Sequence, residues 1–116
     1  MTQSYQQFVK SITKDMGSDT LDMLHMAVGI SGEAGELLDA IKKIWVYETC
    51  PDWENITEEL GDLLFYIQGM ANILGIPLQV LIDQNMNKLT KRYPQGYTDQ
   101  AAIARADKMI QGELDV

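Results

Sequence analysis

The sequence predicts an all-α protein of about five helices, built around two long antiparallel helices. Apolar residues recur at intervals of three and four along most of the chain, and no segment shows a convincing β-strand alternation. Glycine and proline interrupt this pattern at a few positions, and the segments between them have the lengths of helices. With 116 residues, the chain is expected to form a single domain over residues 1–116.

The first two helices are predicted at residues 3–15 and 19–46. Gly17 is expected to end the first helix, and Ser18 or Asp19 to cap the second. The amphipathic pattern of the first helix follows the spacing i, i+3, i+4, i+7 and consists of Tyr5, Phe8, Val9 and Ile12.

Three glycines lie inside the second predicted helix, at Gly29, Gly32 and Gly35. Each is less favourable than alanine in a helix by about 1 kcal/mol, so their presence needs a reason. Gly29 and Gly32 lie close to Glu36 on the helical wheel. Two explanations remain open: close approach of another backbone or a ligand, or a kink near residues 29–32.

The third helix is predicted at residues 53–74, after Pro51 has stopped the second and before Gly75. Asp52 or Asn55 can cap its first turn. Asn55 and Glu58 have the spacing of a capping box, which would give Glu58 a structural role.

The fourth helix is expected to start near Pro77 and to run to about Arg92, followed by a turn at residues 93–96. A final helix is predicted at residues 99–111, with Gly112 past its end. Its apolar side is small, which predicts weak docking, and consists of Ala102, Ile103, Ala106 and Ile110.

Two acidic pairs lie at the centre of the chain: Glu33 with Glu36, and Glu59 with Asp62. Residues three apart on a helix face the same way, so side-by-side packing of the two long helices would bring four carboxylates together. Such a cluster destabilises a fold unless a cation neutralises it, and an oxygen-only ligand set suits Mg²⁺ or Mn²⁺. The alternative is that each pair belongs to a solvated helix face.

The position of these acids relative to the apolar residues favours a site. Glu33 and Glu59 border the predicted buried stripes, where an uncompensated charge is unfavourable. The stripes consist of Met26, Ile30, Leu37, Ile41 and Ile44 in the second helix, and of Leu60, Leu63, Leu64, Ile67 and Leu74 in the third.

Three segments carry a resemblance to a known family: GEAGELLDAIKK, EELGDLLFYI and NMNKLTKRYPQGY. Together they resemble the MazG-like all-α nucleotide pyrophosphohydrolases, over roughly residues 20–97. The resemblance implies a Mg²⁺-dependent hydrolase, with Mn²⁺ as a substitute, that converts nucleoside triphosphates to monophosphates and pyrophosphate. It also implies a helical bundle shared between protomers. Together with the broad apolar stripes, this predicts a homodimer or a tetramer built of dimers.

In this interpretation Glu33, Glu36, Glu59 and Asp62 hold the metal, and Glu33 or Glu36 acts on the attacking water. Candidate phosphate ligands lie on one face of the fourth helix, and the resemblance extends to the first two of them: Asn85, Lys88 and Arg92. Cations near a helix C-terminus also complement the helix dipole, which is the structural alternative.

Three more candidates for substrate binding lie on the second helix. Lys43 points in nearly the same direction as Glu36, but it can equally pair with Asp39. His25 also lies near that direction and is a candidate base or ribose contact, or simply a core histidine. Trp45 can stack on a nucleobase, or belong to the core or a dimer interface.

Composition limits the partners. Seventeen acidic and nine basic residues give a net charge of −8, which disfavours nucleic acids and anionic membranes. A single cysteine, Cys50, excludes an internal disulfide; with no signal sequence, this predicts a cytoplasmic protein.

Two other enzyme classes are disfavoured by the sequence. A Nudix hydrolase is disfavoured because Glu54 and Asn55 replace its Arg-Glu pair, and a di-iron bundle because the chain has one histidine. The remaining alternative is a non-catalytic nucleotide-binding or structural helical oligomer.

Overall fold

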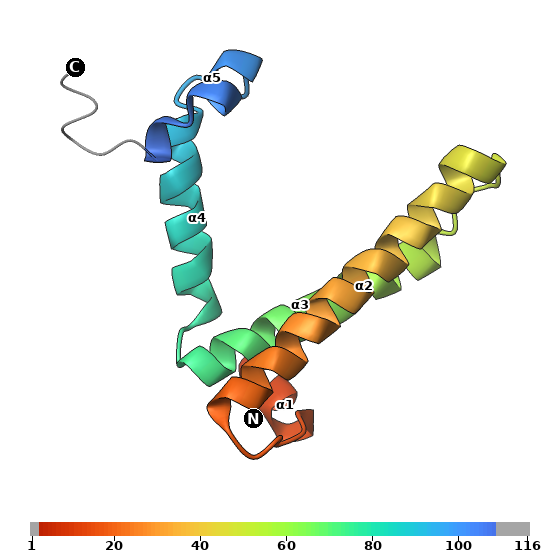
Figure 1. The fold of residues 1–116 in the computed structure, drawn as a ribbon, viewed down its shortest axis with the longest axis vertical. Helices are drawn as coiled ribbons and strands as arrows, with labels where there is room; N and C mark the ends of the chain where they lie inside the picture. The colour runs from red at the N-terminus through yellow and green to blue at the C-terminus, as the bar shows by residue number, and fades with distance from the viewer. Residues whose placement is uncertain (1–2, 109–116) are drawn as a thin grey trace. The chain divides into compact units, whose positions relative to one another are not determined.

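The protein is all-α in the part of the chain that its computed structural model describes, residues 3–108. No strand occurs in this range, which confirms the predicted fold class. By its internal contacts the chain divides between Ile76 and Pro77 into two compact units. The elements are α1 (Tyr5–Ile12), α2 (Asp19–Tyr47), α3 (Trp53–Leu74), α4 (Leu78–Arg92), α5 (Asp99–Ala104) and the 3₁₀ turn η1 (Ala106–Lys108) (Figure 1).

Helix α1 begins with a capping box, in which the Ser4 hydroxyl accepts from the Gln7 amide and the Gln7 side chain accepts from the Ser4 amide. It ends at Ile12, three residues before the predicted end, because the backbone at Thr13 is extended. The helix packs on α3, where Asn72 Nδ2 donates a 3.1 Å hydrogen bond to the Gln6 carbonyl.

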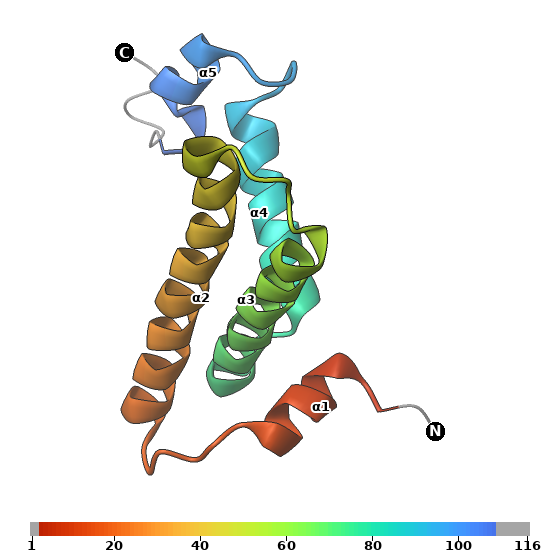
Figure 2. The same ribbon diagram turned by 90° about the vertical axis from the view of Figure 1, so that its right-hand side faces the viewer.

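Helices α2 and α3 form a long antiparallel pair, as Figures 1 and 2 both show. Ser18 caps α2 by accepting from the Leu21 amide, and Glu48 ends it in the left-handed conformation. Asp52 caps α3 by accepting a 3.0 Å hydrogen bond from the amide of Asn55. The predicted capping box that starts at Asn55 is therefore wrong, because Asn55 already lies in the first helical turn.

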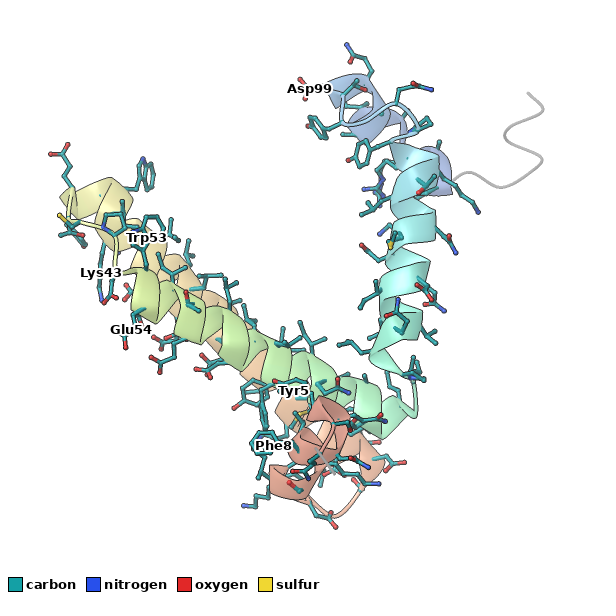
Figure 3. All side chains as sticks on the ribbon, turned by 180° about the vertical axis from the view of Figure 1, so that it is seen from behind. Tyr5, Phe8, Lys43, Trp53, Glu54 and Asp99 are labelled. Carbon is teal, nitrogen blue, oxygen red and sulfur yellow. The ribbon has the colours of Figure 1, made fainter. Side chains whose placement is uncertain are left out.

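The far end of the pair, marked in Figure 3 by Lys43 and Trp53, lies opposite the end that carries Tyr5 and Phe8 of α1. Only a few side chains of the described residues are buried, and they follow the seams between α1, α2 and α3: Val9, Met26, Ala40, Gln68 and Ala71.

The prediction that one apolar stripe of α3 is buried is wrong for a single copy of the chain. Four of its members are exposed, by 37–53% of their surface: Leu60, Leu64, Ile67 and Leu74. The seam with α2 is formed instead by a neighbouring face that includes Tyr66 and the buried Gly69. Apolar residues cover two adjacent faces of α3, and the sequence pattern did not tell which of the two meets α2.

In the second unit, Pro77 is the N-cap of α4 and does not lie in its first turn. The predicted helix at residues 99–111 is only partly formed. Helix α5 ends at Ala104 because Arg105 adopts a left-handed conformation, with φ of 50°. The short turn η1 follows it, and Ile110 and Gly112 lie outside the described residues.

An ion pair holds η1 against α4 within this unit. Arg92 donates to both carboxylate oxygens of Asp107, from Nε at 2.6 Å and from Nη2 at 3.0 Å. The hydrogen bonds to Arg92 hold the pKa of the Asp107 carboxyl below its ordinary value, and the same contact raises the pKa of Arg92.

No single helix among residues 3–108 is long and apolar enough to cross a membrane. The consecutive helices α3 and α4 are long and apolar enough only when they are counted together as one span with a bend between them.

Candidate metal centre

Three carboxylates meet on the seam between α2 and α3. Glu33 of α2 and Glu59 and Asp62 of α3 each offer an oxygen, and these oxygens lie within 4.8 Å of one another. All three residues are half-buried. Glu59 and Asp62 are three residues apart on α3 and therefore lie on one side of that helix. Because α3 packs along α2, both of them can reach Glu33.

Glu36 lies outside this group. Its residue is exposed, yet its charge still contributes to raising the pKa of Glu59, so the two carboxylates are within electrostatic range. The structure thus brings three of the four acidic residues into one cluster and places the fourth at its edge.

Glu59 is the most perturbed member of the cluster. A hydrogen bond with Glu33 raises its pKa to about 7, and burial and repulsion from Glu33, Glu36 and Asp62 add to this effect. Its Oε2 atom is buried and receives no hydrogen bond from the N–H or hydroxyl groups of residues 3–108. An ionised carboxylate in that position is unfavourable, so a shared proton or a cation is needed to compensate it.

The donor set fits a hard divalent cation. It contains carboxylate oxygens and neither sulfur nor imidazole, as is typical of Mg²⁺ and Mn²⁺ sites and not of structural zinc sites. The unpartnered oxygen of Glu59 is a ligand atom that a cation would satisfy. The cluster is therefore able to hold a metal ion.

Next to the carboxylates, the ring of Tyr66 packs directly onto Gly29, and a Cβ atom at Gly29 would overlap the ring. The close approach to Gly29 is thus made by a side chain. His25 lies edge-on to the same ring at 6.3 Å between centroids. Its Nδ1 is buried and has no hydrogen-bond partner within residues 3–108, so this atom can still accept or donate one hydrogen bond.

The other candidates on α2 lie near its C-terminal end. Lys43 Nζ forms a 3.2 Å ion pair with Asp39, and both side chains are more than half exposed. Such a surface pair is weak and leaves the ammonium group available to a phosphate. Trp45 is 82% exposed, so it is not a core residue of the isolated chain.

The candidates on α4 belong to the second unit. Asn85 is exposed and Lys88 is half-buried, and Lys88 makes no ion pair with any residue in the range 3–108. Arg92 is engaged by Asp107, so a phosphate that bound Arg92 would have to compete with that carboxylate.

Two hollows of about 320 Å³ lie away from the carboxylates. One is apolar and lies along α2, next to Leu38 and Trp45. The other lies between α1, the start of α2 and the end of α3, next to Lys10, Asp22 and Asn72. None of the four acidic residues lines either hollow.

Sequence reasoning missed two features. The ion pair of Asp107 with Arg92 joins segments whose spacing carries no periodic signal. The contact of Met26 with Gly69 was also missed, although a signal existed: Gly69 follows Tyr66 by three residues, as Gly29 follows Met26.

Comparison with known proteins agrees with this geometry. The profile of the MazG nucleotide pyrophosphohydrolase domain matches residues 22–97, which include the three clustered carboxylates and Glu36. The chain is also 33% identical over 76 residues to the Gene 37 protein of Mycobacterium phage L5, an alignment that covers 62% of this chain and 67% of the phage protein. No solved structure matches significantly. With most of its length matched by the domain profile, the chain belongs to the MazG nucleotide pyrophosphohydrolase family.

Proposed function

We propose that the protein hydrolyses nucleoside triphosphates to monophosphates and pyrophosphate in a Mg²⁺-dependent reaction, with Mn²⁺ as a substitute. The observation that supports this most directly is the cluster of Glu33, Glu59 and Asp62 in a chain of this family. Mg²⁺ commonly joins protein carboxylates to substrate phosphates, so the cluster lets a protein with a net charge of −8 bind a polyanion.

In the proposed reaction Glu33, Glu59 and Asp62 hold the cation. When bound, the cation neutralises phosphate charge and makes a water molecule more acidic. Glu36 stays outside the cluster and is exposed, so its carboxylate remains free to orient the attacking water and accept its proton. Glu33 is the less suitable base because it shares a hydrogen bond with Glu59.

Lys88, which makes no ion pair in the described part of the chain, is the proposed ligand for charge that develops on the triphosphate. Asn85 and Arg92 lie on the same helix and are proposed to assist it. On α2, Lys43 is a further candidate phosphate ligand. Trp45 is a candidate base-stacking residue. His25, whose buried Nδ1 has no hydrogen-bond partner within residues 3–108, is a candidate general base or ribose contact.

We further propose a homodimer, or a tetramer built of dimers. Large apolar side chains remain exposed on both long helices, and the carboxylate cluster lies on the seam between these same helices. A second copy would cover these side chains and enclose the site. Those on α2 and α3 that are at least half exposed are Leu24, Val28, Leu38, Trp45, Tyr47, Trp53, Leu60 and Leu74. A cytoplasmic location, expected from the single cysteine, belongs to the same proposal.

The proposal is tested by incubating each common ribo- and deoxyribonucleoside triphosphate with the protein and Mg²⁺ and separating the products by chromatography. Monophosphate and pyrophosphate are expected, and a chelator should abolish their formation. The same assay is run on two variants. Glu59→Gln changes a carboxylate of the cluster, and Glu54→Gln, at an exposed carboxylate on α3 outside the cluster, is its matched control. Diphosphate with inorganic phosphate would show cleavage at the wrong bond. Metal and nucleotide binding without any turnover would favour the non-catalytic alternative.

A further inference from the structure

Two reciprocal contacts interlock α2 and α3 beside the metal cluster. The ring of Tyr66 on α3 lies against Gly29 on α2, and the sulfur of Met26 on α2 lies against Gly69 on α3. A Cβ atom at either glycine would overlap the opposing side chain. Met26 has no exposed surface, and Gly69 is buried. Each helix thus inserts one side chain into a glycine notch of the other.

The interlock lies on the same seam as the carboxylates. Glu33 follows Gly29 by four residues on α2, and Asp62 precedes Tyr66 by four residues on α3. Because the helices are antiparallel, these two steps run in the same direction in space, each about 6 Å along the helix axis. The first carboxylates beyond the interlock are therefore about one helical turn away.

Other helical glycines of the chain make no such contact. A Cβ at Gly32, Gly35 or Gly61 would meet no atom of the described chain within 4 Å. Helix axes usually lie 8–10 Å apart, and a glycine at the contact lets them approach more closely or accept a bulkier side chain. All five of these glycines, Gly29, Gly32, Gly35, Gly61 and Gly69, have the same unfavourable helix propensity. Gly29 and Gly69 differ from the other three because a side chain of the opposite helix packs against them.

We infer that the Tyr66–Gly29 and Met26–Gly69 contacts are positioning contacts, which fix the spacing and register of α2 and α3 so that Glu33, Glu59 and Asp62 reach one cation. This inference rests on the metal site of the proposed function. Mg²⁺ demands nearly ideal octahedral geometry, whereas Ca²⁺ accepts longer and more variable ligand distances. A change in helix spacing should therefore weaken Mg²⁺ binding more than Ca²⁺ binding.

The test is calorimetric titration of the full chain with Mg²⁺ and with Ca²⁺, on protein shown to be helical by circular dichroism. Gly29→Ala should weaken Mg²⁺ binding by roughly tenfold or more, as is typical when supporting residues of a metal site are lost. It should weaken Ca²⁺ binding less. Gly35→Ala is the matched control in the same helix, and both of its affinities should stay near the wild-type values because no described atom opposes Gly35.

A double variant tests whether the effect of Gly29→Ala on Mg²⁺ affinity comes from overlap with the Tyr66 ring. Tyr66→Ala removes the ring that an alanine at position 29 would strike, so Gly29→Ala should have little further effect in that background. If Gly29→Ala does not fold, Tyr66→Leu provides the same test, because it removes atoms from the seam and should lower the preference for Mg²⁺ over Ca²⁺.

Three outcomes would overturn the inference. Unchanged Mg²⁺ affinity in folded Gly29→Ala, or in Tyr66→Leu where that variant replaces it, would show that the interlock does not position the ligands. Equal losses for both ions would reduce the contact to a structural role. If the wild-type chain binds no divalent cation, the proposed metal site itself fails and this inference falls with it.

Discussion

The carboxyl groups of Glu33 and Glu59 face each other across the α2–α3 seam, and their hydrogen bond is the main cause that raises the pKa of Glu59 to about 7. This contact between two acids of different helices favours the protonated form of Glu59, and a bound cation would compensate the same negative charge. This relationship links the fold, its stability and metal binding, because all three depend on how that negative charge is compensated.

The first prediction concerns pH. A carboxyl whose pKa is higher in the folded than in the unfolded state binds more protons when folded between about pH 4.5 and 7, so its contribution to stability is lost as the pH rises through that range. In a chelator, the Tm of the wild type should therefore fall by more between pH 5 and 8 than that of Glu59→Gln. Saturating Mg²⁺ should restore the wild-type Tm at pH 8. Identical pH profiles for the two proteins would contradict the shifted pKa.

The second prediction separates the proposed metal ligands from the proposed base. Glu59→Gln and Asp62→Asn should weaken Mg²⁺ binding strongly, because both residues belong to the cluster. Glu36→Gln should lower kcat by at least ~10²-fold, the low end for a positioned base, with a smaller effect on metal affinity. Calorimetry and steady-state kinetics on the same preparations measure the two effects. Loss of metal binding in Glu36→Gln as severe as in Asp62→Asn would place Glu36 among the ligands.

The third prediction concerns Lys88. Because this lysine is proposed to act on phosphate and not on the cation, Lys88→Ala should lower kcat/KM while the Mg²⁺ affinity in the absence of nucleotide stays nearly unchanged. Lys91→Ala, at an exposed position on the same helix, is the matched control. Equal kinetics for the two variants would remove Lys88 from the proposed site.

The fourth prediction concerns the ion pair that joins α4 to η1. Asp107→Ala leaves the Arg92 guanidinium without its partner and should lower the Tm, whereas replacing both residues by apolar ones, as in Arg92→Met with Asp107→Leu, should recover part of the loss. The pKa of Asp107 is lowered by Arg92 from its ordinary value of 3.8, so the stabilisation is fully present above that value and is lost as the pH falls through the lowered pKa. Thermal melts at pH 3 and 7 measure both effects. Equal Tm losses in Asp107→Ala at the two pH values would argue against the pair.

The fifth prediction concerns assembly. Light scattering at micromolar concentration should report a dimer or a tetramer, because the exposed apolar residues of α2 and α3 need a cover. Leu38→Glu, which places a charge on the exposed apolar side of α2, should shift the equilibrium towards the monomer. Thr20→Glu adds the same single charge at an exposed polar position of α2 outside that apolar hollow, and it is the control for the effect of charge alone. A monomeric wild type at this concentration would contradict the proposed dimer or tetramer.

The amino-acid sequence was enough to predict the two long helices and the acidic pairs that they carry. The bounds of α3 agree with the prediction, because Pro51, Asp52 and Gly75 act locally through backbone geometry and capping. The pairing of Glu33 with the acids of α3 was also predictable, since helical periodicity and one tight connection are enough to place one acidic pair near the other.

Features that depend on contacts between distant segments could be seen only in the folded chain. The tertiary structure determined which apolar face of α3 meets α2, it placed Tyr66 on Gly29, and it left Glu36 at the edge of the cluster. It also ended α5 at Ala104 and joined Asp107 to Arg92. Periodicity gives the direction of a side chain on its own helix, but the choice between two apolar faces depends on how closely two backbones approach. In this protein that approach is closest where Gly29 and Gly69 each receive a side chain from the opposite helix.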